Sequence, residues 1–142
     1  MRGLFDAEAS VDVKGYIEFK QLADTKGIKL VNRVFNMLKA LGIDSTSVKT
    51  KNDRNIKTDA YLYVKDLQGF QKKIGFVDDL KKTKLKNLIK IKTKNNTPKL
   101  EDIKKLLSED KNLWEILIEL ESPYHKVRKT LKDNHLTIRQ TR

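Results

Sequence analysis

In the stretch MRGLFDAEAS at residues 1–10, two carboxylates, Asp6 and Glu8, follow a short apolar run and are candidates for a chemical role. They fit a buried start to a small domain, or a helix end that delivers an acid to a chemical site. The sequence has no cysteine, which excludes thiolate catalysis, disulfides and cysteine metal sites. His125 and His135 both lie near the C-terminus, so a bound metal would be a hard cation such as Mg²⁺ held by carboxylates.

The charge of the chain favours a polyanionic partner. Its 142 residues carry 31 Lys and Arg against 19 Asp and Glu, a formal net charge of +12. Basic side chains on phosphates release condensed counterions, so nucleic acid is the leading partner class and a membrane surface the weaker alternative. No apolar run approaches the roughly 18 residues of a spanning helix, and no signal-peptide pattern is present. We expect an intracellular protein, cytoplasmic and nucleoid-associated or organellar.

Two stretches of alternating hydropathy predict two β-hairpins. In residues 10–21 apolar and polar side chains alternate on either side of Gly15, which sits where a tight turn is expected. Residues 46–51 and 58–64 flank the turn-rich NDRN segment, and the second of these stretches alternates clearly. We therefore expect four antiparallel strands.

Helices are predicted around these hairpins. Asp24 suits an N-cap, and apolar residues recur at helical spacing from there until Gly42. Two further helical stretches occupy residues 67–76 and 80–92. Helices that cover one face of the sheet leave its other face polar and open to a partner, so we predict an α+β layer.

The C-terminal third has a different pattern. Composition marks residues 93–98 as a linker between a first domain, residues 1–92, and a helical extension, residues 99–142. Pro98 sits at a helix-starting position, a stripe of leucine and isoleucine follows, and Pro123 begins a further helix. Three short helices with a brief turn before the third match the outline of a helix-turn-helix module.

Residues 1–9, MRGLFDAEA, resemble the signature of the LAGLIDADG homing endonuclease family. Four motif positions match as they stand, namely Gly3, Leu4, Asp6 and Ala7. Glu8 replaces the second aspartate, and Ala9 stands where the motif's last glycine is usual. The predicted element order up to about residue 91, αββαββα, is also the order of that family. The resemblance implies a homodimeric endonuclease that makes Mg²⁺-dependent, site-specific double-strand breaks in DNA.

The resemblance also assigns roles to the motif residues. In the family, the motif helices of two subunits, or of two halves of one chain, pack through an interface that here would hold Gly3, Leu4 and Ala7. Gly3 and Ala7 are four residues apart and share one helix face. The helix end then brings Glu8 beside its symmetry mate, where Glu8 and Ala7 would hold Mg²⁺ or another divalent cation. Asp6 is expected to have a supporting or capping role rather than to be a metal ligand.

Three residues are assigned to catalysis by the resemblance: Glu8, Gln21 and Lys82. Gln21 ends the second strand, where the family often has a polar residue near the active site. Lys82 resembles the family's basic residue beside the scissile phosphate, where a cation stabilises charge or orders water. Lys81 is the alternative to Lys82, and a solvated helix face accounts for either lysine equally well.

The family lays its polar sheet face in the major groove of DNA. The side chains expected there are Asp12, Lys14, Tyr16, Glu18, Lys20, Ser47, Lys49, Lys51, Tyr61 and Tyr63. Residues 122–142 resemble the recognition helix and exit of helix-turn-helix domains. Four of their side chains would be available to DNA: His125, Arg128, Lys129 and Lys132. A basic helical pair that only packs on the main domain is the alternative.

A second hypothesis is a nucleic-acid-binding protein that keeps the scaffold without cleavage, either a DNA-binding regulator or an intron RNA maturase. Glu8 discriminates between the two hypotheses, because a nuclease needs the acid whereas a binding protein tolerates its loss. With one motif in the chain, cleavage requires a homodimer or a second motif-bearing half. A small-molecule enzyme is remote, since the sequence shows no phosphate loop, nucleophile elbow or cofactor fingerprint.

Overall fold

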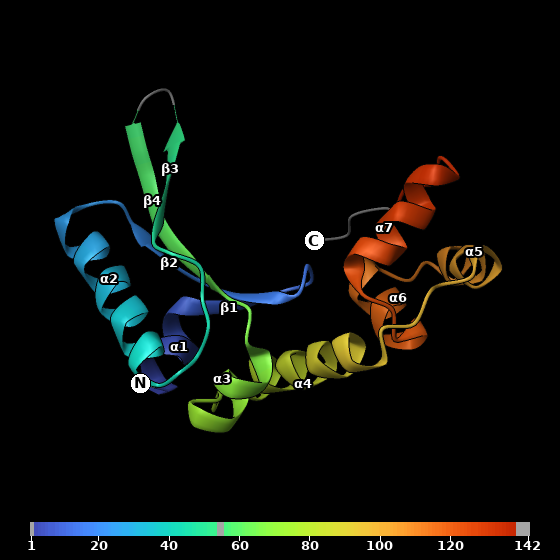
Figure 1. Ribbon diagram of the computed structural model, residues 1–142. Coiled ribbons are helices and arrows are strands. Elements are labelled where there is room, and N and C mark those ends of the chain that lie inside the picture. Colours follow the sequence, from blue (N-terminus) through green and yellow to red (C-terminus); the bar gives the residue numbers. More distant parts are fainter. Residues whose placement is uncertain (1, 54–55, 139–142) are drawn as a thin grey trace. The chain divides into compact units, whose positions relative to one another are not determined.

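The computed structural model describes residues 2–53 and 56–138 and has the predicted α+β class (Figure 1). In chain order the elements are α1 (Arg2–Glu8), β1 (Ala9–Asp12), β2 (Tyr16–Leu22), α2 (Thr25–Ala40), β3 (Lys49–Asp53), β4 (Ile56–Val64), α3 (Leu67–Lys73), α4 (Asp79–Lys94), α5 (Leu100–Ser108), α6 (Leu113–Leu120) and α7 (Tyr124–Asp133). This order confirms the predicted succession of helix and hairpin.

The chain divides into two compact units. The sheet unit consists of residues 1–12 and 16–85, and the helical unit of residues 13–15 and 86–142. Helix α4 begins in the first unit and ends in the second. The predicted division into two domains and a linker stays a prediction.

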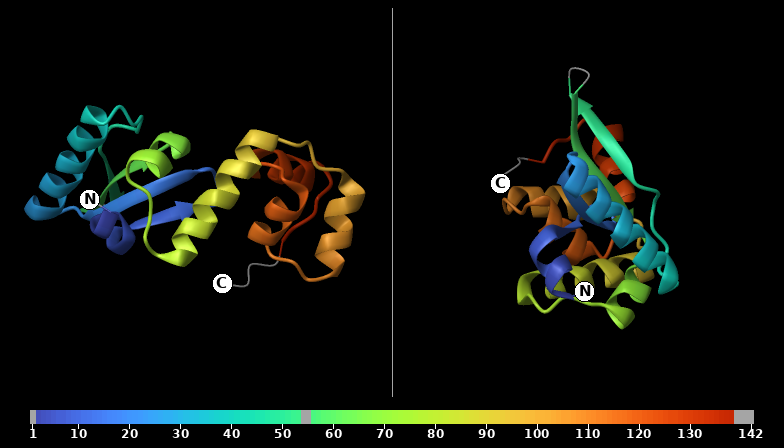
Figure 2. Two further views of the ribbon diagram at one scale, coloured as in Figure 1. Left: turned by 90° about the horizontal axis from the view of Figure 1, so that it is seen from below. Right: turned by 90° about the vertical axis from the view of Figure 1, so that its left-hand side faces the viewer.

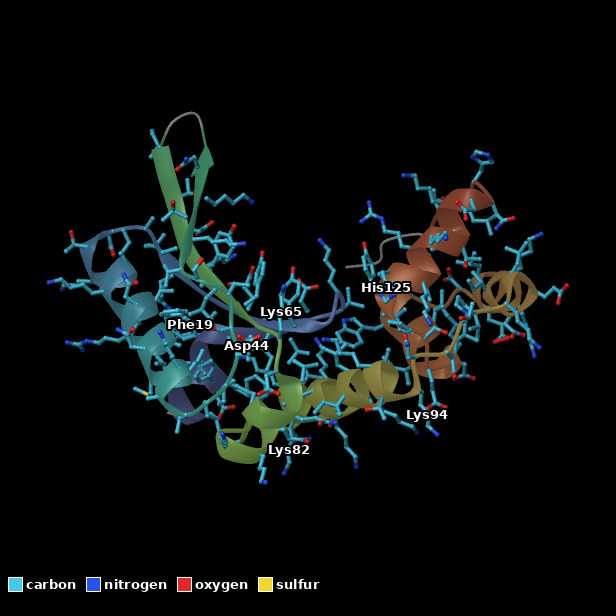
Figure 3. The ribbon with its side chains drawn as sticks, in the orientation of Figure 1. Phe19, Asp44, Lys65, Lys82, Lys94 and His125 are labelled. Atoms are coloured by element: carbon cyan, nitrogen blue, oxygen red, sulfur yellow. The ribbon has the colours of Figure 1, made fainter. Side chains whose placement is uncertain are left out.

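The sheet unit is built on four antiparallel strands in the order β1-β2-β4-β3. The two central strands pair Ile17 with Val64 and Phe19 with Leu62, and these four side chains are all fully buried. Helices α1 and α2 pack on the face that carries them (Figures 1 and 2), and Phe19, which Figure 3 labels, belongs to this layer. Because side chains alternate along a strand, the opposite face carries the polar set.

An aromatic cluster attaches α1 to the rest of the sheet unit. The ring of Phe5 lies 5.4 Å from that of Phe19 on β2 and 4.9 Å from that of Phe70 on α3. Phe76 extends the cluster at 5.1 Å from Phe70. A seven-residue helix is too short to be stable by itself in water, so α1 depends on tertiary contacts such as the burial of Phe5.

Local signals account for the ends of α2. The carboxylate of Asp24 accepts a hydrogen bond of 2.7 Å from the Gly27 amide, which confirms the predicted N-cap. A Cβ on Gly27 would lie 1.8 Å from the carbonyl oxygen of Leu22, so only glycine fits there. The helix ends before Gly42, which has a φ of +74°.

Two of the side chains predicted for the polar face of the sheet lie outside the strands. Lys14 is in the turn between β1 and β2, and Ser47 precedes β3, which begins only at Lys49. At Thr46 the hydroxyl accepts from the Tyr63 amide at 3.0 Å, while the Thr46 amide donates to the Tyr63 carbonyl. A side chain thus takes the place of a main-chain acceptor, and the regular ladder starts three residues later than the hydropathy pattern predicts.

The helical unit has a core of its own. Its buried apolar side chains come from the end of α4 and from α5, α6 and α7, and they are Ile91, Ile103, Leu106, Ile116, Leu117, Val127 and Leu131. Helix α6 begins with a capping box, in which Asn112 accepts from the Glu115 amide and Glu115 accepts from the Asn112 amide. Among the described residues, no helix is both long enough and apolar enough to cross a membrane.

Replacement of Phe5 by alanine is expected to destabilise the sheet unit by about 3–5 kcal/mol, because it leaves a cavity against two aromatic rings. Urea unfolding followed by circular dichroism measures this change. Lys39→Ala, on the exposed side of α2, is the control and should change stability by less than about 0.5 kcal/mol. Equal stability of the two variants would contradict the role given to Phe5.

Candidate functional site

The motif helix α1 buries one side and exposes the other. Phe5 points into the core, whereas Gly3, Ala7 and Glu8 are exposed and Leu4 is half-buried. Outside the helix itself, no atom of the described residues lies within 4 Å of the position that a Cβ on Gly3 would take. The helix therefore presents a flat face of small residues with an acid at its end.

Glu8 and Gln21 meet at the end of this helix. The Nε2 atom of Gln21, near the end of β2, donates a hydrogen bond of 2.9 Å to Oε2 of Glu8. The amide orients the carboxylate. Two residues to which the sequence analysis assigns catalysis, from different elements, are thus brought together.

Asp6, which the sequence analysis expects to support or cap, is bonded to main-chain amides from a distant segment. Its carboxylate accepts hydrogen bonds from the amides of Val77 at 2.9 Å and Asp78 at 3.2 Å, in the segment that leads into α4. This carboxylate is therefore engaged in joining α1 to the start of α4, two residues before Glu8 in the chain.

The two candidate lysines have different surroundings. The ammonium group of Lys81 donates to the main-chain carbonyl of Asp6, which places it against the motif helix. Lys82, labelled in Figure 3, is exposed and lines a cavity of about 350 Å³ with residues 71–76 and Leu85. The structure thus brings Lys81 to α1, and which lysine lies beside a phosphate stays a prediction.

The open face of the sheet collects most of the predicted nucleic-acid contacts. Strand register puts Glu18 opposite Tyr63, and Tyr61 between Lys20 and Lys49. The residues that share this face are Asp12, Tyr16, Glu18, Lys20, Lys49, Lys51, Tyr61 and Tyr63. Lys14 and Ser47 lie beside it, in the turn and the connection described above.

Three tyrosines form a row on this face. The rings of Tyr16 and Tyr63 stack at 4.0 Å, and Tyr61 lies 5.2 Å from Tyr63. Burial raises the pKa of Tyr16 well above its ordinary value, and a hydrogen bond with Tyr63 and the negative charges of Asp12 and Glu18 raise it further. Tyr16 therefore stays neutral at physiological pH, and its hydroxyl keeps its proton for hydrogen bonding.

The predicted residues of the helical unit also share a surface. His125, Arg128, Lys129 and Lys132 are all exposed on α7, while Val127 and Leu131 of the same helix are buried. The helix is thus amphipathic in the way that the sequence predicts, with its basic side chains in solvent.

Within the described residues, no group of three or more His, Asp or Glu side chains could hold a metal ion. The oxygen ligands that the resemblance assigns to a cation, the Glu8 carboxylate and the Ala7 carbonyl, lie at the exposed end of α1. Such oxygen atoms suit a hard cation, and their exposure leaves them accessible to a second copy of the chain. The donor set fits Mg²⁺ only if that second copy contributes its own acid.

The fold and the site together define a class of protein: a four-stranded sheet covered by helices on one face and polar on the other, with an acid-ended exposed helix at its start. A family model described as a LAGLIDADG-like domain matches residues 1–75, which is more than half of the chain. The chain belongs to the LAGLIDADG family, which includes homing endonucleases and maturases and typically binds DNA and dimerises. Searches of the curated proteins and of the solved structures gave no match.

Two exposed apolar residues near the motif helix are absent from the sequence-based site. Val77 and Leu80 are 62% and 66% exposed, and the hydrogen bonds of Asp6 tie their segment to α1. Their signal in the sequence is weak: two large apolar side chains on either side of a pair of aspartates, at the start of a lysine-rich helix. Their proximity to α1 depends on a contact between residues 71 positions apart.

Tyr16→Phe is expected to remove the most alkaline tyrosine ionisation of the protein. A tyrosine whose pKa rises on folding stabilises the fold below its unfolded pKa of about 10, and this stabilisation is lost as the pH rises through the folded value. Absorbance titration at alkaline pH measures the ionisation, and Tyr124→Phe is the control. A most alkaline step that survives in Tyr16→Phe would contradict the assignment.

Proposed function

We propose that the protein is a homodimeric, Mg²⁺-dependent, site-specific DNA endonuclease. The observation that carries the proposal is the exposed Glu8 carboxylate, oriented by Gln21 at the end of the motif helix. The structural role in this helix belongs to Asp6, which joins α1 to the start of α4. An exposed Glu8 adds nothing to that connection. Glu8 is thus left for chemistry with groups from outside the chain.

In the proposed dimer, the small-residue faces of two α1 helices pack against each other. Gly3 and Ala7 allow close approach of the helix axes, and the two Glu8 side chains come together at the end of the interface. Val77 and Leu80 flank α1 and would be buried by the same contact, which accounts for two large apolar side chains in solvent.

In the proposed site, Glu8 and the Ala7 carbonyl of each subunit hold the cation. Bound Mg²⁺ would activate water and stabilise the leaving oxygen in phosphodiester hydrolysis. Gln21 keeps the Glu8 carboxylate in one orientation through their 2.9 Å hydrogen bond. Lys81 or Lys82 supplies positive charge near the phosphate.

The polar face of the sheet is the proposed DNA surface. Its lysines suit phosphate contacts, and its row of tyrosine hydroxyls suits hydrogen bonds to base edges. Because Tyr16 is held neutral, it acts there as a hydrogen-bond donor as well as an acceptor.

Glu8→Gln is expected to abolish cleavage and to leave DNA binding in place, because it removes the charged ligand and keeps the shape of the side chain. The protein would be incubated with fragmented host genomic DNA, with and without Mg²⁺, and the new ends sequenced. Gln21→Ala should reduce the cleavage rate about 10–100-fold, as loss of an orienting partner does. Glu101→Gln, an exposed acid on α5, is the matched control and should cleave as the native protein does.

Retention of one DNA fragment without any cut would reject the nuclease and favour the binding-only hypothesis, a regulator on the same scaffold. Preferential retention of an intron RNA would favour the maturase.

Replacement of both Val77 and Leu80 by serine is expected to weaken the dimer by about tenfold or more, since the interface loses two large apolar side chains. Analytical ultracentrifugation over a concentration series measures the dissociation constant. The matched control replaces Leu22 and Ile56, which are 70% and 67% exposed elsewhere in the sheet unit, by serine. Equal dimer dissociation constants for the two double variants would remove Val77 and Leu80 from the interface.

A further inference from the structure

Charge is unevenly distributed within the helical unit. Between residues 99 and 121, which hold α5 and α6, seven carboxylates stand against four lysines. Between residues 122 and 138, which hold α7, four Lys and Arg stand against the single carboxylate of Asp133. The end of α4 in the same unit, residues 86–94, carries four lysines and no carboxylate. Within the unit, a polyanion would therefore be attracted to α7 and to the end of α4 rather than to α5 and α6.

The basic side chains of α7 lie on one helix face. His125, Arg128, Lys129 and Lys132 follow the spacing i, i+3, i+4, i+7, which places them in a single stripe, and all four are exposed. The buried side of the helix is occupied by Val127 and Leu131. The stripe therefore points away from the core of the helical unit.

The basic side chains of α7 differ in whether they are already bonded to other parts of the helical unit. The ammonium group of Lys126 donates to the Asn95 carbonyl at 2.8 Å, so this lysine holds the end of α4. Arg128 donates from Nη1 to the hydroxyl of Tyr124 at 3.1 Å, and its guanidinium carbon lies 5.9 Å from the centre of that ring. Arg128 is thus pre-oriented on its own helix, and its other donors remain for a ligand.

The connection between α6 and α7 is short. Three residues, Glu121, Ser122 and Pro123, join the helices, and Glu121 takes a left-handed conformation with φ of +49°. The Ser122 side chain is fully buried, and its amide donates to the Leu117 carbonyl. The Glu121 carboxylate lies 3.9 Å from the ammonium group of Lys90 on α4. A turn of this length between two helices that share a core is the arrangement used by helix-turn-helix modules.

We infer that α7 is a second nucleic-acid-binding surface, which enters the major groove of duplex DNA and uses Arg128, Lys129 and Lys132 as its cationic contacts. Duplex DNA is the partner because its major groove, about 12 Å wide, admits an α-helix, whereas the deep, narrow major groove of duplex RNA does not. Single strands are bound through exposed aromatic platforms. Tyr124, the aromatic ring of α7, is half-buried and engaged with Arg128.

This inference rests on the proposed function only in taking the same DNA as partner. The sheet face and α7 lie on different units of one chain, so binding by one raises the effective concentration of DNA at the other. In a dimer, two α7 helices would lengthen the protected stretch of DNA on both sides of the cleavage site.

The test compares two triple variants that remove the same charge. One replaces Arg128, Lys129 and Lys132 by alanine, and the matched control replaces three exposed lysines of the helical unit by alanine, namely Lys99, Lys104 and Lys105. Binding to a mixed-sequence DNA duplex several helical turns long is measured in EDTA over a range of salt concentrations. Circular dichroism and thermal unfolding check that both variants fold, since all replaced side chains are exposed.

The α7 variant is expected to bind at least about tenfold more weakly, with a logarithmic salt dependence shallower by about 2–3, one for each phosphate that the variant no longer neutralises. The control should change that slope by less than about one. Footprinting should show a shorter protected stretch for the α7 variant alone. Equal slopes and equal footprints for the two variants would overturn the inference.

A duplex RNA of the same length decides the partner class. If native binding to RNA is tighter than to DNA and depends on α7, the assignment to duplex DNA is overturned. The assay is separate from cleavage, because EDTA removes the metal and Glu8 is untouched. If the protein never cleaves, but the α7 variant has the shallower salt dependence of DNA binding, the nuclease alone is refuted. If the protein is a metal-dependent nuclease, but its two triple variants bind DNA equally, this inference alone is refuted.

Discussion

The burial of Phe5 is the interaction on which the rest of the candidate site depends. Its ring is enclosed by Phe19 and Phe70, and a helix of seven residues is too short to hold its position without tertiary contacts of this kind. With Phe5 pointing inward, helical periodicity turns Gly3 and Ala7 outward and leaves Glu8 exposed at the helix end. The packing of one aromatic side chain therefore determines both the free face of the motif helix and the exposure of its acid.

The two acids of the motif have been separated into two tasks by what they contact. Asp6 accepts main-chain amides from the segment before α4, so it connects α1 to a distant part of the chain. Glu8 accepts a hydrogen bond from the side-chain amide of Gln21 at one of its two carboxylate oxygens, and its side chain is exposed.

In the proposed function, the two units of the chain would bind nucleic acid by different physical means. The sheet unit offers a polar face of lysines and stacked tyrosines whose spacing is set by strand register. The helical unit offers the exposed basic side of α7, while its residues 99–121, which hold α5 and α6, carry more carboxylates than lysines. The family match ends at residue 75, so α5, α6 and α7 lie outside it.

The features that depend on neighbours along the chain could be predicted from the sequence alone. They are the order of helices and strands, the N-cap at Asp24, the alternation of apolar and polar side chains along β4 and the buried side of α7. These follow from local periodicity and capping. Two contacts could not be predicted from the sequence and are seen only in the folded chain. They join Glu8 to Gln21, 13 residues apart, and Lys81 to Asp6, 75 residues apart. The tertiary structure also decided that β3 starts at Lys49, because Thr46 competes with its own main chain for Tyr63. Contacts between distant residues leave no periodic signal in the sequence, and the pairing geometry alone brings them together.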